Sequence, residues 1–180
     1  MKHLLLTGAT AFLLATNALP LEAFKPPGGA AALARAGETT VFAFRTKSGK
    51  TAALCRGPKG AYLVYRFGTA AKVELQYPAK LDASSWQKFT YWSYTRGGGA
   101  ANEGMESAQL RFENGGVEYT LTDATRAYYT RQHEEDYRRE VGIDVSVKGK
   151  PVSVVGMAAT AVGDLSDVKK DGKVKIDEEM

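Results

Sequence analysis

The chain of 180 residues carries little of the chemistry that disulfides and metal sites require. Cys55 is its only cysteine, so a disulfide within the chain is excluded. Of its two histidines, only His133 lies outside the first few residues. Zinc sites usually draw several ligands from histidine and cysteine, so we predict no metal site. Cys55 lies in an alternating segment and is expected to be a buried thiol, with pairing between molecules or a reactive thiol as open alternatives.

Long apolar runs and dense basic blocks are also missing. Beyond the first 23 residues no apolar run reaches the roughly 20 residues that a membrane-spanning helix needs, so we predict no stable membrane insertion. Lysine and arginine number 24 against 20 aspartate and glutamate, which gives a net charge of +4. This surplus is spread along the chain and forms no basic block, so we predict no nucleic-acid partner.

Residues 1–23 have the layout of a secretory signal peptide. Lys2 precedes an apolar stretch over residues 4–15, and a small residue, Ala23, stands at the expected cleavage position, with Ala18 as the alternative. A membrane anchor is the rival interpretation, but the apolar stretch is too short for it. The sequence therefore predicts a periplasmic or secreted protein.

Short segments of alternating apolar and polar residues follow one another through most of the chain. They cover residues 41–45, 51–55, 61–67, 72–77, 89–95, 107–113, 117–123 and a hairpin over 142–156. A period of two is typical of strands, and Asn114-Gly115 between two such segments is a strong hairpin signal. About eight to ten short strands predict a single all-β domain, an antiparallel barrel or sandwich.

The expected domain boundaries follow changes in composition. Residues 24–40 begin with Pro-Pro-Gly-Gly and predict a flexible leader, and residues 41–163 form the β domain. Residues 124–141 within it are dense in charge and tyrosine and show no clear alternation, which predicts a short helix or a long loop. Residues 164–180 are expected to form a terminal hairpin at Asp171-Gly172 or a tail.

A glycine-rich segment, TRGGGAANEG over residues 95–104, is the most conspicuous candidate site. It follows a strand and lacks a terminal Lys-Ser/Thr, so it is not a nucleotide-binding loop, and we predict no cofactor. One interpretation is a corner between strands that glycine permits. The other is a loop that contacts a partner. The candidate partner-binding residues are Tyr94, Arg96, Gly97, Gly98, Gly99, Asn102 and Glu103.

Catalytic arrangements can be drawn from the sequence, but none is singled out. Glu103 with Glu106 could form a carboxylate pair, and Cys55 with His133 could form a nucleophile and base. Carboxylates are common, and His133 lies in a charged segment typical of solvated surface. We therefore predict that the protein is not an enzyme.

Four blocks carry a resemblance to known proteins. LVYRFGT (63–69), VELQYP (73–78), SYTRGGGAANEGM (93–105) and LRFENGGVEYTL (110–121) resemble a set of largely uncharacterised bacterial secreted or periplasmic proteins. This resemblance implies export and a β-rich fold, and it brings no catalytic residues. The chain is also similar in plan to periplasmic lysozyme inhibitors, small exported β-barrels that offer a loop to the enzyme. Their tryptophan-rich block is absent here, and one cysteine cannot make the disulfide that they commonly carry.

Three functional hypotheses follow from these patterns. The first is a non-enzymatic binding protein that inhibits or neutralises a protein of the cell envelope, such as a cell-wall hydrolase or a toxin, through residues 96–105. The second is an envelope protein that binds glycan or peptidoglycan through its exposed aromatic residues. The third is a hydrolase.

Overall fold

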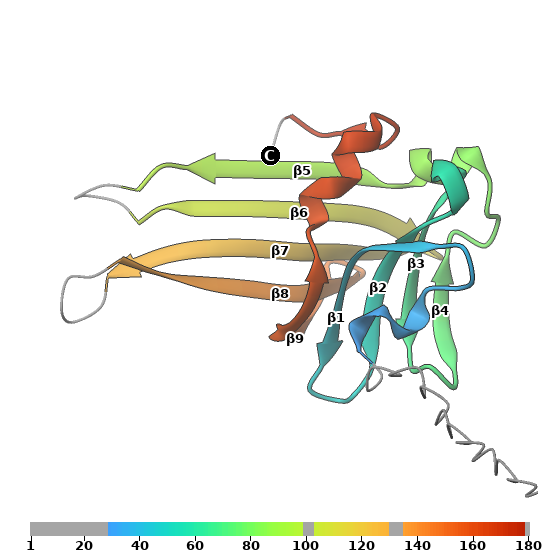
Figure 1. Cartoon of the computed structure of the whole chain (residues 1–180), viewed down its shortest axis with the longest axis horizontal. Helices are drawn as coiled ribbons and strands as arrows, with labels where there is room; N and C mark the ends of the chain where they lie inside the picture. The colour runs from blue at the N-terminus through green and yellow to red at the C-terminus, as the bar shows by residue number, and fades with distance from the viewer. Residues whose placement is uncertain (1–28, 99–102, 130–134, 179–180) are drawn as a thin grey trace, which may run out of the picture.

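The computed structural model describes residues 29–98, 103–129 and 135–178, and the expected signal peptide lies outside these ranges. The described part of the chain forms one curled sheet, a half-barrel, in the order β10-β5-β6-β7-β8-β9-β1-β2-β3-β4 (Figure 1). All neighbouring strands are antiparallel except β10 and β5. The strands are β1 (Thr39–Thr46), β2 (Thr51–Arg56), β3 (Leu63–Gly68), β4 (Val73–Tyr77), β5 (Thr90–Arg96), β6 (Met105–Asn114), β7 (Val117–Tyr129), β8 (Glu135–Val147), β9 (Lys150–Gly163) and β10 (Lys175–Ile176). The prediction of a small all-β domain with eight to ten strands is confirmed.

Four short 3-10 helices connect or flank the strands. They are η1 (Ala30–Leu33), η2 (Pro58–Gly60), η3 (Ala83–Lys88) and η4 (Leu165–Asp171). None of the helices in the described ranges has the length and apolar character to cross a membrane.

The main core fills the concave face of the curled sheet. Strand alternation places Phe42, Leu54 and Tyr65 of β1–β3 on this face, and the curl brings them together with Leu110 and Leu121 of β6 and β7. Trp86 of η3 and the apolar side of η4 complete the cluster. This core holds the two ends of the sheet around one interior.

The other face of β1–β3 is covered as well. Ala43, Ala53, Cys55 and Val64 lie there in a second apolar cluster, closed by Leu33 of η1. The expectation of a flexible leader over 24–40 is therefore wrong for residues 29–40, since Leu33 packs on the sheet and β1 begins at Thr39. A leucine in an alanine-rich stretch has an apolar face to bury, and the sheet supplies the partner surface.

An ion pair with fully buried side chains fixes this connection. The guanidinium of Arg66 on β3 donates to both carboxylate oxygens of Glu38, over 2.6 and 2.9 Å, and to the carbonyl of Leu33. Tyr62 also donates to the Glu38 carboxylate, over 2.8 Å. Burial alone would raise the pKa of Glu38, but these hydrogen bonds outweigh it and lower the pKa to about 2.

The helix or long loop expected over residues 124–141 is not found in the described residues 124–129 and 135–141, which are strands. β7 runs through Tyr129, β8 begins at Glu135, and the two strands pair in unbroken register over the described residues. Charged and tyrosine side chains on adjacent strands hold this hairpin: Tyr128 donates to Asp136 over 2.6 Å. A dense run of charge indicated a loop, yet cross-strand pairs let a strand keep polar side chains on both faces.

Residues 164–180 were expected to form a terminal hairpin or a tail, and over the described residues 164–178 the hairpin does not form: a 3-10 helix, η4, takes its place. Leu165 and Val168 are fully buried and lie on the same side of η4, as a spacing of three residues does in a 3-10 helix. Asp164 caps the helix by accepting the backbone N–H of Ser166 over 2.7 Å, and Gly172, at φ 63°, ends it. The chain then pairs β10 parallel with β5.

Candidate functional site

The free ends of β5–β8 extend beyond the rest of the sheet (Figure 1). This extension is here named the wing. It comprises Trp92–Arg96 of β5, Met105–Ser107 of β6, Ala124–Tyr129 of β7 and Glu135–Arg138 of β8. Among the described residues β10 pairs with β5 only at Thr90 and Tyr91, and β9 pairs with β8 only from Gly142 onward. Both outer strands of the wing therefore have an open backbone edge within the described part of the chain.

Arg96 closes the end of the β5–β6 hairpin. Its Nε and Nη2 atoms donate to the backbone carbonyl of Glu103 over 3.2 and 3.1 Å. The carbonyl of Gly104 accepts the backbone N–H of Ala127 over 2.8 Å, which ties the same corner to β7. The guanidinium thus holds the corner from within, while the side chain of Glu103 is exposed.

Steric demand differs among the described glycines of this segment. A Cβ atom added to Gly104 would lie 3.3 Å from the backbone nitrogen of Gly98, so the chain approaches itself closely there. A Cβ atom added to Gly97 would contact nothing within 4 Å, and Gly98 is exposed. Gly99 and Asn102 lie outside the described residues. The interpretation that a corner between strands requires glycine is therefore not supported at Gly97.

Tyr94 lies on the convex face of the wing. Its ring stacks on that of Trp92, with centroids 6.1 Å apart and planes 5° from parallel. Tyr94 is 41% exposed. Strand alternation places Ser93 and Thr95 on the opposite, concave face.

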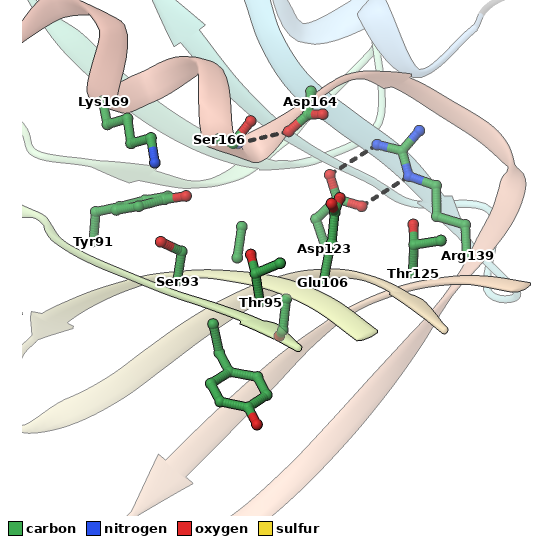
Figure 2. Close-up of a pocket in the computed structure, with 13 residues that line it drawn as sticks. Tyr91, Ser93, Thr95, Glu106, Asp123, Thr125, Arg139, Asp164, Ser166 and Lys169 are labelled. Atoms are coloured by element: carbon green, nitrogen blue, oxygen red, sulfur yellow. Dashed lines mark hydrogen bonds and ion pairs between the residues drawn. The ribbon is translucent and has the colours of Figure 1, made fainter. Parts of the chain in front are cut away.

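A polar groove of about 370 Å³ lies on that concave face, between η4 and the root of the wing (Figure 2). Hydroxyl-bearing and charged side chains dominate its walls. The lining residues are Tyr91, Ser93, Tyr94, Thr95, Glu106, Ser107, Ala108, Asp123, Thr125, Arg139, Asp164, Ser166 and Lys169.

An ion pair forms one end of the groove. Arg139 on β8 donates to both carboxylate oxygens of Asp123 on β7, each over 2.8 Å, and to the carbonyl of Gly163 over 2.8 Å. Asp123 also accepts the backbone N–H of Leu165 over 3.1 Å. The hydrogen bonds that Arg139 donates to the Asp123 carboxylate raise the pKa of Arg139. These contacts join β7, β8, the end of β9 and η4, so the pair anchors η4 over the sheet.

Asp164 completes this end of the groove. Burial alone would raise its pKa, but the Ser166 hydrogen bonds and the charge of Arg139 lower it. Asp164 is therefore an anion that caps η4. Asp123 is occupied by three donors, so neither carboxylate is placed as a general base for a bound substrate.

Tyr91 lies beneath η4 with its hydroxyl turned into the groove (Figure 2). The residue is 1% exposed, and its hydroxyl has no hydrogen-bond partner among the described residues. Burial raises the pKa of Tyr91, and the nearby Ser93 side chain offsets part of that rise. Leaving a buried hydroxyl unpaired costs about 1–3 kcal/mol.

The catalytic pairs suggested by the sequence are not assembled in the described structure. Glu106 lines the groove, but Glu103 does not. Cys55 is fully buried on the far side of the sheet, and burial, with the nearby charge of Glu38, raises the pKa of its thiol to about 11. A protonated, inaccessible thiol is a poor nucleophile. His133 lies outside the described residues.

Metal-binding chemistry is not found in the described ranges either. No group of three or more histidine, cysteine, aspartate or glutamate side chains there could hold a metal ion. The prediction that Cys55 is buried is confirmed.

The residues that form the groove come from distant parts of the sequence. Asp123 directly precedes the segment that was expected to be a helix or loop, Arg139 lies within that segment, and Lys169 lies in the expected terminal hairpin or tail. Alternation across β7 and β8 was the one signal that could have placed Asp123 and Arg139 on the same face. Nothing in the sequence indicates that Tyr91 lies beneath η4.

Comparison with known proteins finds no relative of this chain. No protein-family model matches the chain, and no curated protein or solved structure matches it. The resemblance to bacterial exported proteins therefore stays a prediction, and the functional argument rests on the geometry of the wing and the groove.

Proposed function

We propose that this is an exported, non-enzymatic binding protein that engages a protein of the cell envelope, such as a cell-wall hydrolase or a toxin, through the wing. The observation that carries the proposal is the exposure of large aromatic side chains there, at Tyr94, Tyr129 and Tyr137. Tyrosine and arginine are enriched where proteins contact one another, because they combine a large apolar area with directed hydrogen bonds.

Exposed arginines accompany these rings. Arg96 stands at the end of β5, and Arg126 and Arg138 lie on the neighbouring strands β7 and β8. The guanidinium of Arg138 lies over the ring of Tyr128, 5.2 Å from its centre. Such stacking presents the charge in a fixed position, which lowers the entropy lost when a partner binds.

The open edge of β5 supports the same proposal. The backbone from Trp92 to Arg96 has no strand on its outer side among the described residues. A strand of the target could pair along this edge, with the stacked rings of Trp92 and Tyr94 beside it. Arg96 then has a structural role, since it holds the hairpin corner next to the contact.

Inhibition of peptidoglycan digestion tests the proposal directly. The purified mature protein is added to a panel of cell-wall hydrolases, including lysozyme, and release of soluble fragments is followed. Inhibition of one enzyme is expected, and Tyr94→Ala should weaken it roughly tenfold or more. Val73→Ala is the matched control, because Val73 is 40% exposed and lies on β4 at the opposite edge of the sheet.

Two outcomes would contradict the proposal. Full inhibition by a Tyr94→Ala, Tyr129→Ala double variant would remove the wing as the contact surface. Failure to inhibit any hydrolase, together with no complex captured from an envelope extract, would reject the protein-binding function.

Export is part of the same proposal and is tested separately. Cleavage after Ala23 gives a mature chain that begins at Phe24. Mass spectrometry of the protein from the periplasm or medium of an expressing bacterium should find this N-terminus. Recovery of the uncleaved chain from the cytoplasm alone would contradict it.

A further inference from the structure

The groove beneath η4 contains polar groups that the fold itself does not use. The Tyr91 hydroxyl has no hydrogen-bond partner among the described residues, although almost all of the residue is buried. Buried polar groups in native proteins are nearly always paired, so an unpaired one that faces a cavity points to a missing ligand. Figure 2 shows this hydroxyl directed into the groove.

The Tyr91 side chain is held firmly in this position. Tyr91 pairs with Leu110 of β6 on one side and with Ile176 of β10 on the other. Its ring packs in the main core, and the ammonium of Lys169 lies over the ring, 5.8 Å from its centre. The hydroxyl is therefore preorganised for a ligand rather than free to turn away.

A row of further unused groups crosses the sheet beside it. Thr95, Glu106 and Thr125 stand directly opposite one another on β5, β6 and β7. Within the described residues none of these three side chains makes a hydrogen bond or ion pair. Directly opposed residues have Cβ atoms about 5 Å apart, so the three present a continuous line of two hydroxyls and one carboxylate.

Ala108 makes the space above this part of the sheet. It lies between Ser93 and Asp123 in the next row of paired residues, and its small side chain leaves the floor of the groove open. The volume of about 370 Å³ lies within the range of small-molecule sites.

The charges of the lining limit the chemistry of the ligand. Three carboxylates face two cations, so the groove carries one excess negative charge when all are ionised. Arg139 offers little to a phosphate, since it is already occupied by Asp123. Lys169, whose ammonium lies over the ring of Tyr91, is the other cation among the described lining residues. Few apolar atoms line the walls, which disfavours a lipid. A ligand whose hydroxyl groups both donate and accept hydrogen bonds therefore fits the lining of the groove best.

We propose that the groove is a binding site for a neutral saccharide, held by the Tyr91 hydroxyl, the Glu106 carboxylate and the hydroxyls of Thr95 and Thr125. The carboxylate accepts from sugar hydroxyls in charge-assisted hydrogen bonds, and the three protein hydroxyls donate or accept as the sugar requires. This site lies on the concave face, opposite the exposed ring of Tyr94. It is thus distinct from the protein contact proposed at Tyr94, although Thr95, Glu106 and Thr125 belong to the wing.

Titration with defined sugars tests this site. The mature protein, labelled with ¹⁵N, is titrated with glucose, galactose, mannose, N-acetylglucosamine and their common disaccharides. Saturable shifts are expected for at least one sugar at the amides of residues 91–95 and 106–108. No saturable binding by any sugar in the panel would overturn the proposal, as would binding of inorganic phosphate or glycine alone.

Tyr91→Phe separates a ligand-binding role from a structural one. The variant removes only the unpaired hydroxyl, so the melting temperature should stay the same or rise, while sugar affinity falls roughly tenfold. Glu106→Gln should weaken binding to a similar extent. Glu113→Gln is its control on the same strand, because Glu113 does not line the groove. Unchanged affinity in both Tyr91→Phe and Glu106→Gln would overturn the assignment.

Discussion

The β1–β4 end of the sheet and the wing use the same strand geometry but are stabilised by different interactions. Strands β1–β3 are buried on both faces, by the main core on one side and by Leu33 with its neighbours on the other. The wing carries polar side chains on both faces, and its strands are joined by contacts such as Tyr128 to Asp136. One continuous sheet thus has a stabilising end that is buried on both faces and a wing whose polar and aromatic side chains remain accessible.

Ion pairs show the same division. Glu38 and Arg66 are shielded from water, whereas Arg126 on the wing and Glu140 next to the wing on β8 are both about half exposed and 3.4 Å apart. A buried charge that loses its partner cannot turn to water, but an exposed one can. The two regions should therefore respond very differently to the loss of one charged group.

The largest difference is expected when Glu38 is removed. Glu38→Ala leaves Arg66 buried without its counter-ion and should lower the free energy of unfolding by about 3–5 kcal/mol. Glu140→Ala, which removes the partner of Arg126 on the wing, should cost at most about 1 kcal/mol. Urea denaturation of both variants measures this difference, and equal losses would remove the distinction between the two regions.

Acid should abolish the Glu38 contribution without a mutation. The pKa of Glu38 is about 2 in the folded protein and lies below its ordinary value of 4.5. A lowered pKa stabilises the fold above about pH 4.5, and this stabilisation is lost as the pH falls toward 2. The difference in unfolding free energy between the wild type and Glu38→Gln should therefore shrink over this window. A difference that stays constant from pH 6 to pH 2.5 would contradict this origin.

An intermediate effect is expected at Asp123, where the wing meets the covered sheet. Asp123→Asn removes the charge that Arg139 pairs with, and should lower the unfolding free energy by about 1.5–3 kcal/mol. The backbone N–H of Leu165 donates to the same carboxylate, so its hydrogen exchange should accelerate as η4 loosens. Unchanged exchange at Leu165 would show that η4 is anchored by its apolar contacts alone.

The smallest effect is expected within the wing. Tyr128→Phe removes the hydroxyl that donates to Asp136 but keeps the ring beneath Arg138. The unfolding free energy should fall by no more than about 1 kcal/mol, because both groups can return to water. A loss above about 2 kcal/mol in urea denaturation would mean that the wing contributes to global stability.

Local patterns in the sequence predicted most of the strands. The hairpin expected at Asn114-Gly115 forms, with Gly115 and Gly116 both at positive φ. The hairpin at Lys148-Gly149 forms in the same way. These features depend on a few adjacent residues, so the sequence displays them directly.

The errors lie where packing against distant residues decides the outcome. Residues 124–141 have too few apolar side chains for the usual alternation, and only the opposite strand supplies partners for their charges. Residues 164–180 contain a turn signal at Asp171-Gly172, but burial of Leu165 and Val168 against the core outweighs it. The candidate site at Arg96 was recognised from composition, whereas the groove was not.

The sequence by itself determined the strand segments, their turns and the burial of Cys55, because alternation of apolar and polar residues shows which side chains share a face of the sheet. It could not state what covers that face. Only the tertiary structure decided that Arg66 is sealed beneath η1 while the convex face of the wing stays open. It also decided that the hydroxyl of Tyr91 ends in a polar groove beneath η4. The physical reason is that burial and pairing depend on residues far apart in the chain, which meet only when the sheet curls.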